Sequence, residues 1–301
     1  MQSFSDFEVI VIDDASDFAT RAAYSAIWQN LDARFRLILL GADGGHGSGP
    51  SLARNTGIDS ANGEILTFCD DDDVWTSAGH LAAMAEVFDA GLAVDMYIAD
   101  QVAVGHDGVT QRRSWLPALS ALIGQRQRSH ARGYLLTLDE LARAGGFAQL
   151  NILAVSRATV AVIGGFWTRT SYEEDRDFFW RAADAARAVF FNPDLVAQHN
   201  VPDPARQNNL SRSFSQAERW LLSALVSQHI AISVRSHAIR ALCQTYEGDI
   251  LRRLSQHWSA LGQHALGLQY ARRALAARIS FKWALYTAAL ATRQALRGRQ
   301  A

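Results

Sequence analysis

Four consecutive aspartates, Asp70 to Asp73, follow a short apolar run in this sequence. That run, Ile65 to Cys69, is rich in β-branched and aromatic residues, which predicts a buried strand. The carboxylates should then lie at the carboxyl end of a strand, where open α/β sheets bind ligands. Two charges about 6 Å apart repel by roughly 3 kcal/mol at an effective dielectric near 20, and a divalent cation would remove that cost. The alternative is a solvated acidic turn that caps a helix beginning near Thr76.

A second acidic cluster, Glu173 to Asp177, opens an aromatic-rich stretch that includes Trp180. Acidic residues are favoured at the start of a helix by its dipole, so this cluster taken alone indicates only helix-start chemistry. A histidine, His199, stands in the polar stretch beyond the strand expected at Ala188 to Phe191. A lone histidine is structural or exposed more often than it is a metal ligand, and both interpretations stay open here.

Helices and strands alternate along the first part of the chain. Strands are expected at Phe7 to Ile12, Phe35 to Leu40, Ile65 to Cys69 and Leu92 to Ala99, with helices at 17–31, Ser51 to Ala61 and 76–89. Such alternation predicts an α/β fold with a mostly parallel sheet and helices on both faces. The glycine-rich segment 41–50 lacks the Lys-Ser/Thr of a P-loop, which favours a flexible loop beside a site. Residues 103–135 are less regular and carry scattered arginines, which indicates a variable excursion.

The pattern becomes helical to the end of the chain from about residue 213. This shift predicts two domains, 1–212 and 213–301. Within the second, Trp258-x-x-Leu261-Gly262, with Ala274-Leu275 further on, resembles one tetratricopeptide-type hairpin. A single repeat cannot bury its own face, so we expect it to pack on the first domain or on a partner.

The last apolar segment, Phe281 to Ala291, is too short to span a bilayer, which takes about 20 residues. It is followed by Arg293, Arg297 and Arg299. A packed terminal helix is the favoured interpretation. Peripheral contact of this C-terminal helix with an anionic membrane surface is the alternative.

The composition is that of an ordinary globular protein. The chain has 301 residues, 49% of them hydrophobic, and a formal net charge of −1. These values argue against a nucleic-acid binder. The first residues lack the charged and apolar regions of a secretory signal, so the expected location is the cytoplasm, including the inner face of the membrane.

Three separated acidic motifs, in this order, resemble glycosyltransferase family 2, inverting enzymes of the GT-A fold that use nucleotide-sugar donors. The resemblance extends from residue 4 to about 200, and the matching stretches are Phe7 to Ser16, Ala53-Arg-Asn-Thr-Gly57, Ala61 to Glu64, Phe68 to Trp75, Gly164-Gly-Phe166 and Glu174 to Arg181. The resemblance implies a Rossmann-like GT-A domain in residues 1–212 with an all-α extension in 213–301. Each motif is weak alone, whereas the ordered set is specific.

The resemblance also implies how a donor would be bound. By position, Asp14 together with Asp13 would face the nucleobase, and Arg54 would lie near the base or the diphosphate. Asp70 or Asp71 would meet the ribose. The implied donor is a nucleoside-diphosphate sugar, with a UDP-sugar favoured, and the implied acceptor is a glycan or a lipid-linked hydroxyl in polysaccharide assembly.

Metal binding and catalysis fall on other positions of the resemblance. Asp72 would bind Mn²⁺ or Mg²⁺, which suit hard oxygen ligands and phosphates, and His199 would add a further metal contact. Asp175 matches the general base that takes a proton from the acceptor, and Glu174 would orient that base or touch the acceptor.

One departure from the family concerns the beginning of the sequence. In the family, the strand expected at Phe7 to Ile12 is normally preceded by a strand, a Pro-Thr-Tyr-Asn-like turn and a helix. The printed sequence begins where that helix ends. We expect a start downstream of the true one rather than a truncated relative with damaged donor binding, because the remaining motifs are present.

Two other functions compete with the transferase. Asp70-Asp-Asp-Asp-Val74 also fits the nucleophile motif of a haloacid dehalogenase-type phosphatase, with Asp70 as nucleophile and Asp72 as acid. That chemistry normally uses a lysine, and the one lysine, Lys282, lies in the helical tail. The third possibility is a degenerate, non-catalytic transferase homologue that serves as an interaction module.

Overall fold

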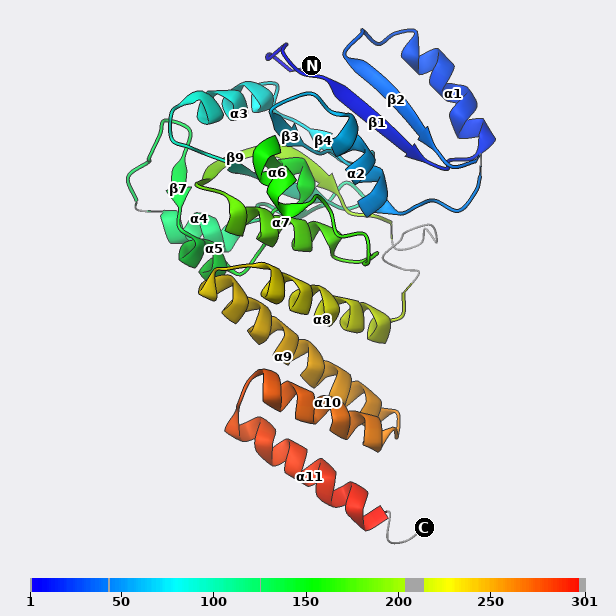
Figure 1. Cartoon of the computed structure of the whole chain (residues 1–301), viewed down its shortest axis with the longest axis vertical. Helices are drawn as coiled ribbons and strands as arrows, with labels where there is room; N and C mark the ends of the chain where they lie inside the picture. Colours follow the sequence, from blue (N-terminus) through cyan, green and yellow to red (C-terminus); the bar gives the residue numbers. More distant parts are fainter. Residues whose placement is uncertain (1, 43, 125, 204–213, 298–301) are drawn as a thin grey trace. The chain divides into compact units, whose positions relative to one another are not determined.

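The computed structural model describes residues 2–42, 44–124, 126–203 and 214–297 (Figure 1). The chain forms two compact units, Met1–Asp203 and Pro204–Ala301. The domain boundary expected between residues 212 and 213 falls outside the described residues. Each unit is therefore considered by itself.

The centre of the first unit is a seven-stranded sheet. Its main path, in spatial order, is β3 (Ile65–Thr67), β8 (Leu153–Ser156), β5 (Met96–Val104), β9 (Val189–Asn200) and β4 (Val74–Trp75). Two further strands lie off this path, with β6 (Thr110–Arg112) paired to β5 and β7 (Tyr134–Leu136) paired to β9. The core runs along β5 and β9, where Tyr97, Ile98, Phe190 and Phe191 are fully buried.

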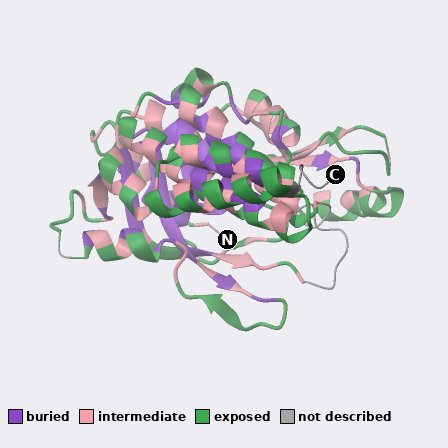
Figure 2. Cartoon of the chain, turned by 90° about the horizontal axis from the view of Figure 1, so that it is seen from below, coloured by how far each residue is buried: buried purple, intermediate pink, exposed green. Residues whose placement is uncertain are grey.

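A separate two-stranded sheet precedes it in the chain. β1 (Val9–Asp14) and β2 (Phe35–Leu40) are parallel and are joined through α1 (Phe18–Trp28). This layer is only partly buried, since α1 buries none of its residues and most of β1 and β2 is intermediate or exposed (Figure 2). Among the described residues, β1 pairs only with β2 and β3 only with β8. The further strand that relatives in the family carry before β1 therefore stays a prediction.

The mixed α/β class is confirmed, but the expectation of a mostly parallel sheet is wrong in detail. Within the described residues, only the β1–β2 and β5–β9 pairs are parallel. The remaining pairs are antiparallel: β8 runs opposite to its neighbours β3 and β5, β6 runs opposite to β5, and β4 and β7 run opposite to β9. The alternation of expected strands and helices in residues 7–99 contained no information on this later strand.

The described residues of the first unit form six further helices. They are α2 (Pro50–Ser60), α3 (His80–Asp89), α4 (Pro117–Ile123), α5 (Leu138–Ala144), α6 (Arg157–Ile163) and α7 (Glu174–Ala185), and a 3₁₀ turn covers Leu150–Ile152. In Figure 1, α6 and α7 lie in front of the seven-stranded sheet. Residues 103–135 are more regular than expected, because they contain β6, α4 and the start of β7.

The second unit consists of packed helices in its described part. They are α8 (Gln216–Ser233), α9 (His237–Ala260), α10 (His264–Ala277) and α11 (Phe281–Arg297). A capping box between Ser215 and Glu218 starts α8, and Gly262, at φ 77°, supplies the turn between α9 and α10. A Cβ on Gly267 would overlap Ser259, so α9 and α10 approach closely there. The hairpin is present, whereas its membership of the tetratricopeptide class stays a prediction.

Candidate functional site

The end of β1 is fixed by Asp13, whose carboxylate is buried. Tyr24 Oη donates to it at 2.5 Å, Arg21 Nη2 at 3.0 Å and the amide of Ser16 at 3.0 Å. Burial opposes ionisation, but the hydrogen bonds from Tyr24, Ser16 and Arg21 outweigh it and lower the pKa of Asp13 to about 2. Arg21 also donates to Leu40 O at 2.8 Å, so Asp13 ties the ends of β1 and β2 together through α1.

Asp14, the next residue, is bound to the glycine-rich loop. Its carboxylate accepts hydrogen bonds from the amides of Ser48 at 2.8 Å and Gly49 at 2.7 Å. A side chain at position 47 would not fit, because a Cβ on Gly47 would lie 2.8 Å from Asp14 Oδ2. The loop is thus closely folded over the end of β1. This contact explains why the loop needs a glycine at that position.

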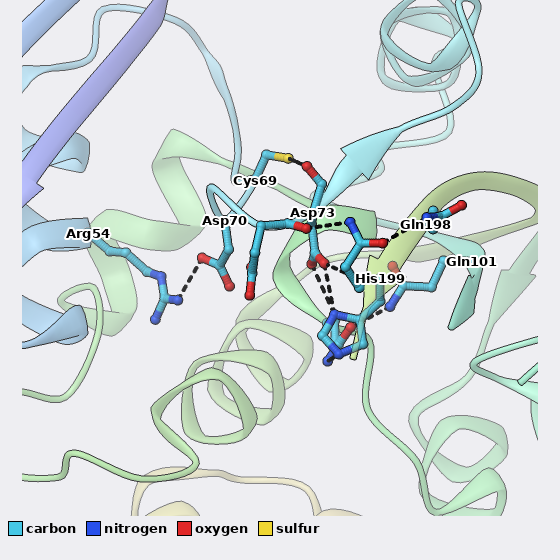
Figure 3. A network of polar contacts seen from close by, with 10 residues as sticks. Arg54, Cys69, Asp70, Asp73, Gln101, Gln198 and His199 are labelled. Carbon is cyan, nitrogen blue, oxygen red and sulfur yellow. Dashed lines mark hydrogen bonds and ion pairs between the residues drawn. The ribbon is translucent and has the colours of Figure 1, made fainter. Parts of the chain in front are cut away.

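Arg54 on α2 bridges two distant parts of the chain. Its Nη2 lies 2.8 Å from Asp70 Oδ1, and its Nη1 lies 2.8 Å from Glu174 Oε1. Burial alone would disfavour the guanidinium charge, but Asp70 and Glu174 raise the pKa of Arg54. Figure 3 shows Arg54 pointing at Asp70 of the aspartate run. Charge-assisted bonds of this kind are stronger than neutral ones, so the bridge fixes the aspartate loop relative to α7.

Asn55, beside Arg54, holds the turn that precedes α7. Its amide nitrogen donates to Phe166 O at 2.9 Å, and its Oδ1 accepts from the amide of Phe166 at 2.8 Å. Gly165 sits at φ 73°, and a Cβ there would lie 2.5 Å from Asn55 Oδ1. The Gly-Gly-Phe motif therefore has a physical reason: only glycine permits this backbone conformation together with this close approach.

Asp175 lies in the first turn of α7. Burial, followed by the neighbouring carboxylate of Glu174, raises the pKa of Asp175 from an ordinary 3.8 to about 7. Its Oδ1 accepts from the amide of Arg176 at 2.7 Å. Glu173 precedes the helix with a left-handed backbone at φ 57°, which is uncommon outside glycine. A carboxyl group with a pKa near neutrality can exchange a proton with a substrate hydroxyl.

A buried ion pair anchors α7 below this turn. Arg181 Nη2 lies 2.6 Å from Asp177 Oδ2, and both side chains are buried. Arg181 also donates to Ile163 O at 2.7 Å and to Gly165 O at 2.8 Å. The pair therefore satisfies the carbonyls at the end of α6 and holds the Gly-Gly-Phe turn against α7.

The aspartate run follows β3 as a short turn, closed by a hydrogen bond of 3.1 Å from the Asp73 amide to Asp70 O. Partial burial, then the charges of Asp73, Asp71 and Asp70, raise the pKa of Asp72. Crowded carboxylates that repel each other form a donor set that suits a hard cation.

Asp73 differs from the rest of the run because it faces inward. His199 Nδ1 lies 2.9 Å from Asp73 Oδ1, and the amide of Asn200 donates to the same oxygen at 3.0 Å. Figure 3 shows this contact beside Gln101 and Gln198. His199 lies within β9 rather than in a polar stretch beyond a short strand, because β9 continues to Asn200 through irregular pairing with β5. With Nδ1 facing the carboxylate, Nε2 is the nitrogen left for a ligand, which would there replace the contact of 3.5 Å from Nε2 to Gln149 Nε2.

Whether a metal ion fits depends on whether the protein alone, or the protein together with substrate phosphates, supplies its ligands. Across the described parts of the chain, no three His, Cys, Asp or Glu side chains form a group that could hold a metal ion. A preformed protein cage is thus not present there. Mg²⁺-type ions bound with substrate phosphates, however, need only one or two carboxylates from the protein. Asp72 and its charged neighbours fit that second arrangement.

The predicted site residues therefore fall into groups. Arg54, Asp70 and Glu174 are brought together and adjoin Asp175, whereas Asp13 and Asp14 bind segments at the end of β1. Asp71 and Asp72 share the turn with Asp70, and His199 contacts Asp73 instead of them. The roles assigned to these residues stay predictions.

Sequence reasoning gave no role to several residues that shape the site. Asn55 and the Asp177–Arg181 pair position the Gly-Gly-Phe turn and α7. Asn55 stands in the Ala-Arg-Asn motif, and Asp177 and Arg181 are four residues apart, a spacing typical of a helical ion pair. The signals were present, but the partners of these side chains, the carbonyls and amides of a distant turn, cannot be seen in a sequence.

Comparison with solved structures places this architecture among the GT-A glycosyltransferases. The structure of Staphylococcus aureus TarS in complex with UDP-GlcNAc superposes with a TM-score of 0.62 at 16% identity, over 92% of this chain and 74% of that one. The mannosyltransferase PcManGT from Pyrobaculum calidifontis, in complex with GDP-Man and Mn²⁺, gives a TM-score of 0.52 at 21% identity, over 98% and 73% of the two chains. These likenesses confirm the expected fold.

A curated relative adds a match in sequence. The GalNAc(5)-diNAcBac-PP-undecaprenol beta-1,3-glucosyltransferase of Campylobacter jejuni is 36% identical over 92 residues, which are 31% of this chain and 28% of that protein. The match thus spans less than a third of the relative. Residues 1–149 match the family described as glycosyl transferase family 2. Through this segment, which contains the glycine-rich loop, Arg54 and the aspartate run, the chain belongs to glycosyl transferase family 2.

Proposed function

We propose that the protein transfers a sugar from a nucleoside-diphosphate donor to an acceptor hydroxyl, with inversion at the anomeric carbon and with Asp175 as general base. The observation that carries the proposal is the pKa of Asp175, raised by burial and Glu174 to about 7, in a residue that adjoins the Arg54 bridge. A base with a pKa near the working pH is the most effective one. The family of residues 1–149 supports the same chemistry.

The donor is proposed to lie over the ends of β1 and β3. Asp14 contacts the nucleobase, and Asp13 acts indirectly, since its carboxylate already accepts from Tyr24 and Arg21. Asp70 or Asp71 binds the ribose. Arg54 lies beside this region with its charge held by Asp70, and it serves the base or the diphosphate.

Asp72 is the proposed ligand of a divalent cation, with His199 as a second contact through Nε2. When bound, Mn²⁺ or Mg²⁺ would neutralise charge on the departing diphosphate. Asp73 fixes the orientation of the histidine ring through Nδ1. The Mn²⁺ in the PcManGT structure supports the use of a divalent ion, and the choice between the two ions belongs to the proposal.

In the transfer step, Asp175 accepts the proton of the acceptor hydroxyl as that oxygen attacks the anomeric carbon. The bond from the anomeric carbon to the diphosphate oxygen breaks, and its electron pair leaves with the nucleoside diphosphate. Attack opposite to the leaving group inverts the configuration. Glu174 keeps α7 and its base in place through Arg54, and contact of Glu174 with the acceptor is part of the proposal.

The substrates are proposed by class. UDP and UDP-GlcNAc in TarS structures favour a UDP-sugar over the GDP-sugar of PcManGT. The undecaprenol-linked substrate named for the Campylobacter relative favours a lipid-linked or glycan acceptor in polysaccharide assembly, at the cytoplasmic face of a membrane. No helix in the described residues is long and apolar enough to cross a membrane.

Calorimetry with UDP and GDP, with and without Mn²⁺ or Mg²⁺, tests the proposal. We expect binding of a nucleoside diphosphate only with the metal, and its loss on chelation. Asp175→Asn should keep this binding and lower transfer by about 10²–10⁴-fold, the usual contribution of a general base. The matched control is Asp59→Asn, an exposed carboxylate on α2. Absence of metal-dependent nucleotide binding would instead support the non-catalytic interaction module.

A further inference from the structure

The last helix, α11, has two apolar faces. Trp283, Thr287 and Leu290 face inward and are buried in the helical unit, and Trp283 Nε1 donates to Ala271 O on α10 at 3.0 Å. On the opposite side, Phe281 is 80% exposed and Leu285 and Leu296 are each 58% exposed. A packed terminal helix normally shows a polar outer face, so the exposed apolar residues need an explanation.

The exposed residues form one continuous stripe. Positions 281, 285, 288, 292 and 296 follow the three- and four-residue spacing of a single helix face, and all five are exposed. Ala288 fills the middle of the stripe, and Thr292 is its one polar member. Ile279, 88% exposed, precedes the helix and extends the apolar surface. We use the name outer stripe of α11 for Ile279, Phe281, Leu285, Ala288, Thr292 and Leu296.

Positive charge borders the outer stripe on one side and at its start. Exposed Lys282 and Arg293 lie along one side of it, and exposed Arg278 lies just before the helix. The segment Phe281–Arg297 contains no Asp or Glu. Across residues 204–301, the sequence has 14 Lys and Arg but only three Asp and Glu. The helical unit is thus strongly basic although the whole chain has a net charge of −1.

We propose that α11 docks in the plane of an anionic lipid surface, with its outer stripe among the acyl chains and Lys282 and Arg293 at the headgroups. An amphipathic helix with a basic border binds such surfaces through buried apolar area and through attraction to anionic lipids. Each Lys or Arg near the surface strengthens this attraction in membranes that contain anionic lipids. The helix lies on the membrane and does not cross it, in accord with its arginines and its length.

A lipid surface explains these features better than a protein partner does. An anionic bilayer meets the apolar stripe and the positive border together, whereas a second copy of the chain would bring equal positive charge against α11. The inward face is already occupied, because the buried Trp283 donates to Ala271 O on α10. The proposal does not depend on the transfer reaction, because its observations all lie in the helical unit.

Vesicle flotation with the full chain tests the proposal. Vesicles of phosphatidylglycerol and phosphatidylcholine should carry the protein upward, vesicles of phosphatidylcholine alone should not, and added salt should weaken the binding. The double variant Phe281→Ser with Leu285→Ser should lower the fraction bound to anionic vesicles by about tenfold or more, since each side chain loses its burial. Lys282→Glu with Arg293→Glu should lower binding at low salt by a similar factor.

Leu261→Ser is the matched control, because Leu261 is 61% exposed in the same unit but lies in the turn between α9 and α10. It should bind vesicles like the unaltered chain, and circular dichroism should show equal helix content in all variants. Flotation that is absent, or that persists unchanged in the Phe281/Leu285 variant, overturns the proposal. A second result also overturns it: the unaltered chain forms a dimer in size-exclusion chromatography, the Phe281/Leu285 variant does not, and neither binds vesicles. The stripe is then a contact between two copies of the chain.

Discussion

Arg54 Nη1 lies 2.8 Å from Glu174 Oε1, and this ion pair joins α2 to the first turn of α7. Glu174 is the charge that contributes most, after burial, to the raised pKa of Asp175, while Arg54 acts in the opposite sense. The proton affinity of the proposed base therefore depends on a residue 121 positions earlier in the sequence. This coupling gives a prediction that concerns pH.

For the unaltered chain, kcat/KM should rise with pH through about 7, because Asp175 accepts a proton only when it is ionised. Arg54→Gln removes a charge that lowers the pKa of Asp175, so the rising limb should move to higher pH. At pH 7, kcat/KM should fall by about 10–100-fold, the equivalent of a lost charge-assisted hydrogen bond. Transfer assays across pH 5–9 measure both effects.

The control is Arg143→Gln, because Arg143 is exposed on α5 and donates to a carbonyl of its own helix, Asp139 O, at 3.3 Å. In this variant, the rising limb of the pH profile of kcat/KM should stay at the same pH. If Arg54→Gln lowers the rate but leaves the limb in place, then Arg54 acts on the donor alone and the coupling to Asp175 is refuted.

The motifs of the site could be predicted from the sequence because their chemistry is local. The run Asp70 to Asp73 and the cluster Glu173 to Asp177 indicate charge at the ends of regular elements. The partner that Asp73 takes in the fold could not be predicted. Asp73 faces His199 while Asp72 stays beside its charged neighbours, and this depends on β9 passing the turn.

The sheet shows the same limit. β1, β2 and β3 follow from apolar runs that end in polar residues, and β2 has the bounds expected for it. β8 was not foreseen, although Leu150 to Ser156 is largely apolar. A short apolar run does not reveal its direction, and the pairing of β8 with β3 and β5 is decided by contacts with residues more than 50 positions away.

Asp175→Asn should stabilise the protein above neutral pH. Folding raises the pKa of Asp175 from 3.8 to about 7, so its stabilising contribution is complete below the lower value and is lost as pH rises through the higher one. Asparagine does not ionise, so the stability of the variant does not change with pH at this position. At pH 8 the melting temperature of the variant should exceed that of the unaltered chain, by about 2–4 °C for each kcal/mol of difference in the free energy of unfolding. This difference in melting temperature should narrow at pH 4.5. A gap that does not change with pH would contradict the raised pKa.

Asp73→Asn should weaken metal-dependent binding of the nucleotide without removing any proposed ligand. Asp73 holds His199 through Nδ1 at 2.9 Å, and outer-shell partners of this kind contribute about 10–100-fold to metal affinity. Titration with Mn²⁺, followed by electron paramagnetic resonance in the presence of UDP, measures the change. Glu64→Gln, an exposed carboxylate before β3, is the control. An unchanged Mn²⁺ affinity in Asp73→Asn would contradict the proposal that the Asp73 carboxylate prepares His199 for metal binding.

Gly164 and Gly165 form a matched pair for testing the turn before α7. Both have φ 73°, so alanine at either position should cost about 1–2 kcal/mol for a left-handed backbone. Only Gly165 also faces Asn55, where a Cβ would lie 2.5 Å from Oδ1, while nothing lies within 4 Å of a Cβ on Gly164.

Gly165→Ala should therefore lose the two hydrogen bonds between Asn55 and Phe166 in addition to the backbone cost. We expect it to be less stable than Gly164→Ala by about 1–3 kcal/mol and to lose more transfer activity, because the turn leads into Asp175. Thermal unfolding of the two variants side by side measures the difference. Equal melting temperatures would mean that the Asn55 contact does not hold the turn, and that the Gly-Gly-Phe motif is required for its backbone conformation alone.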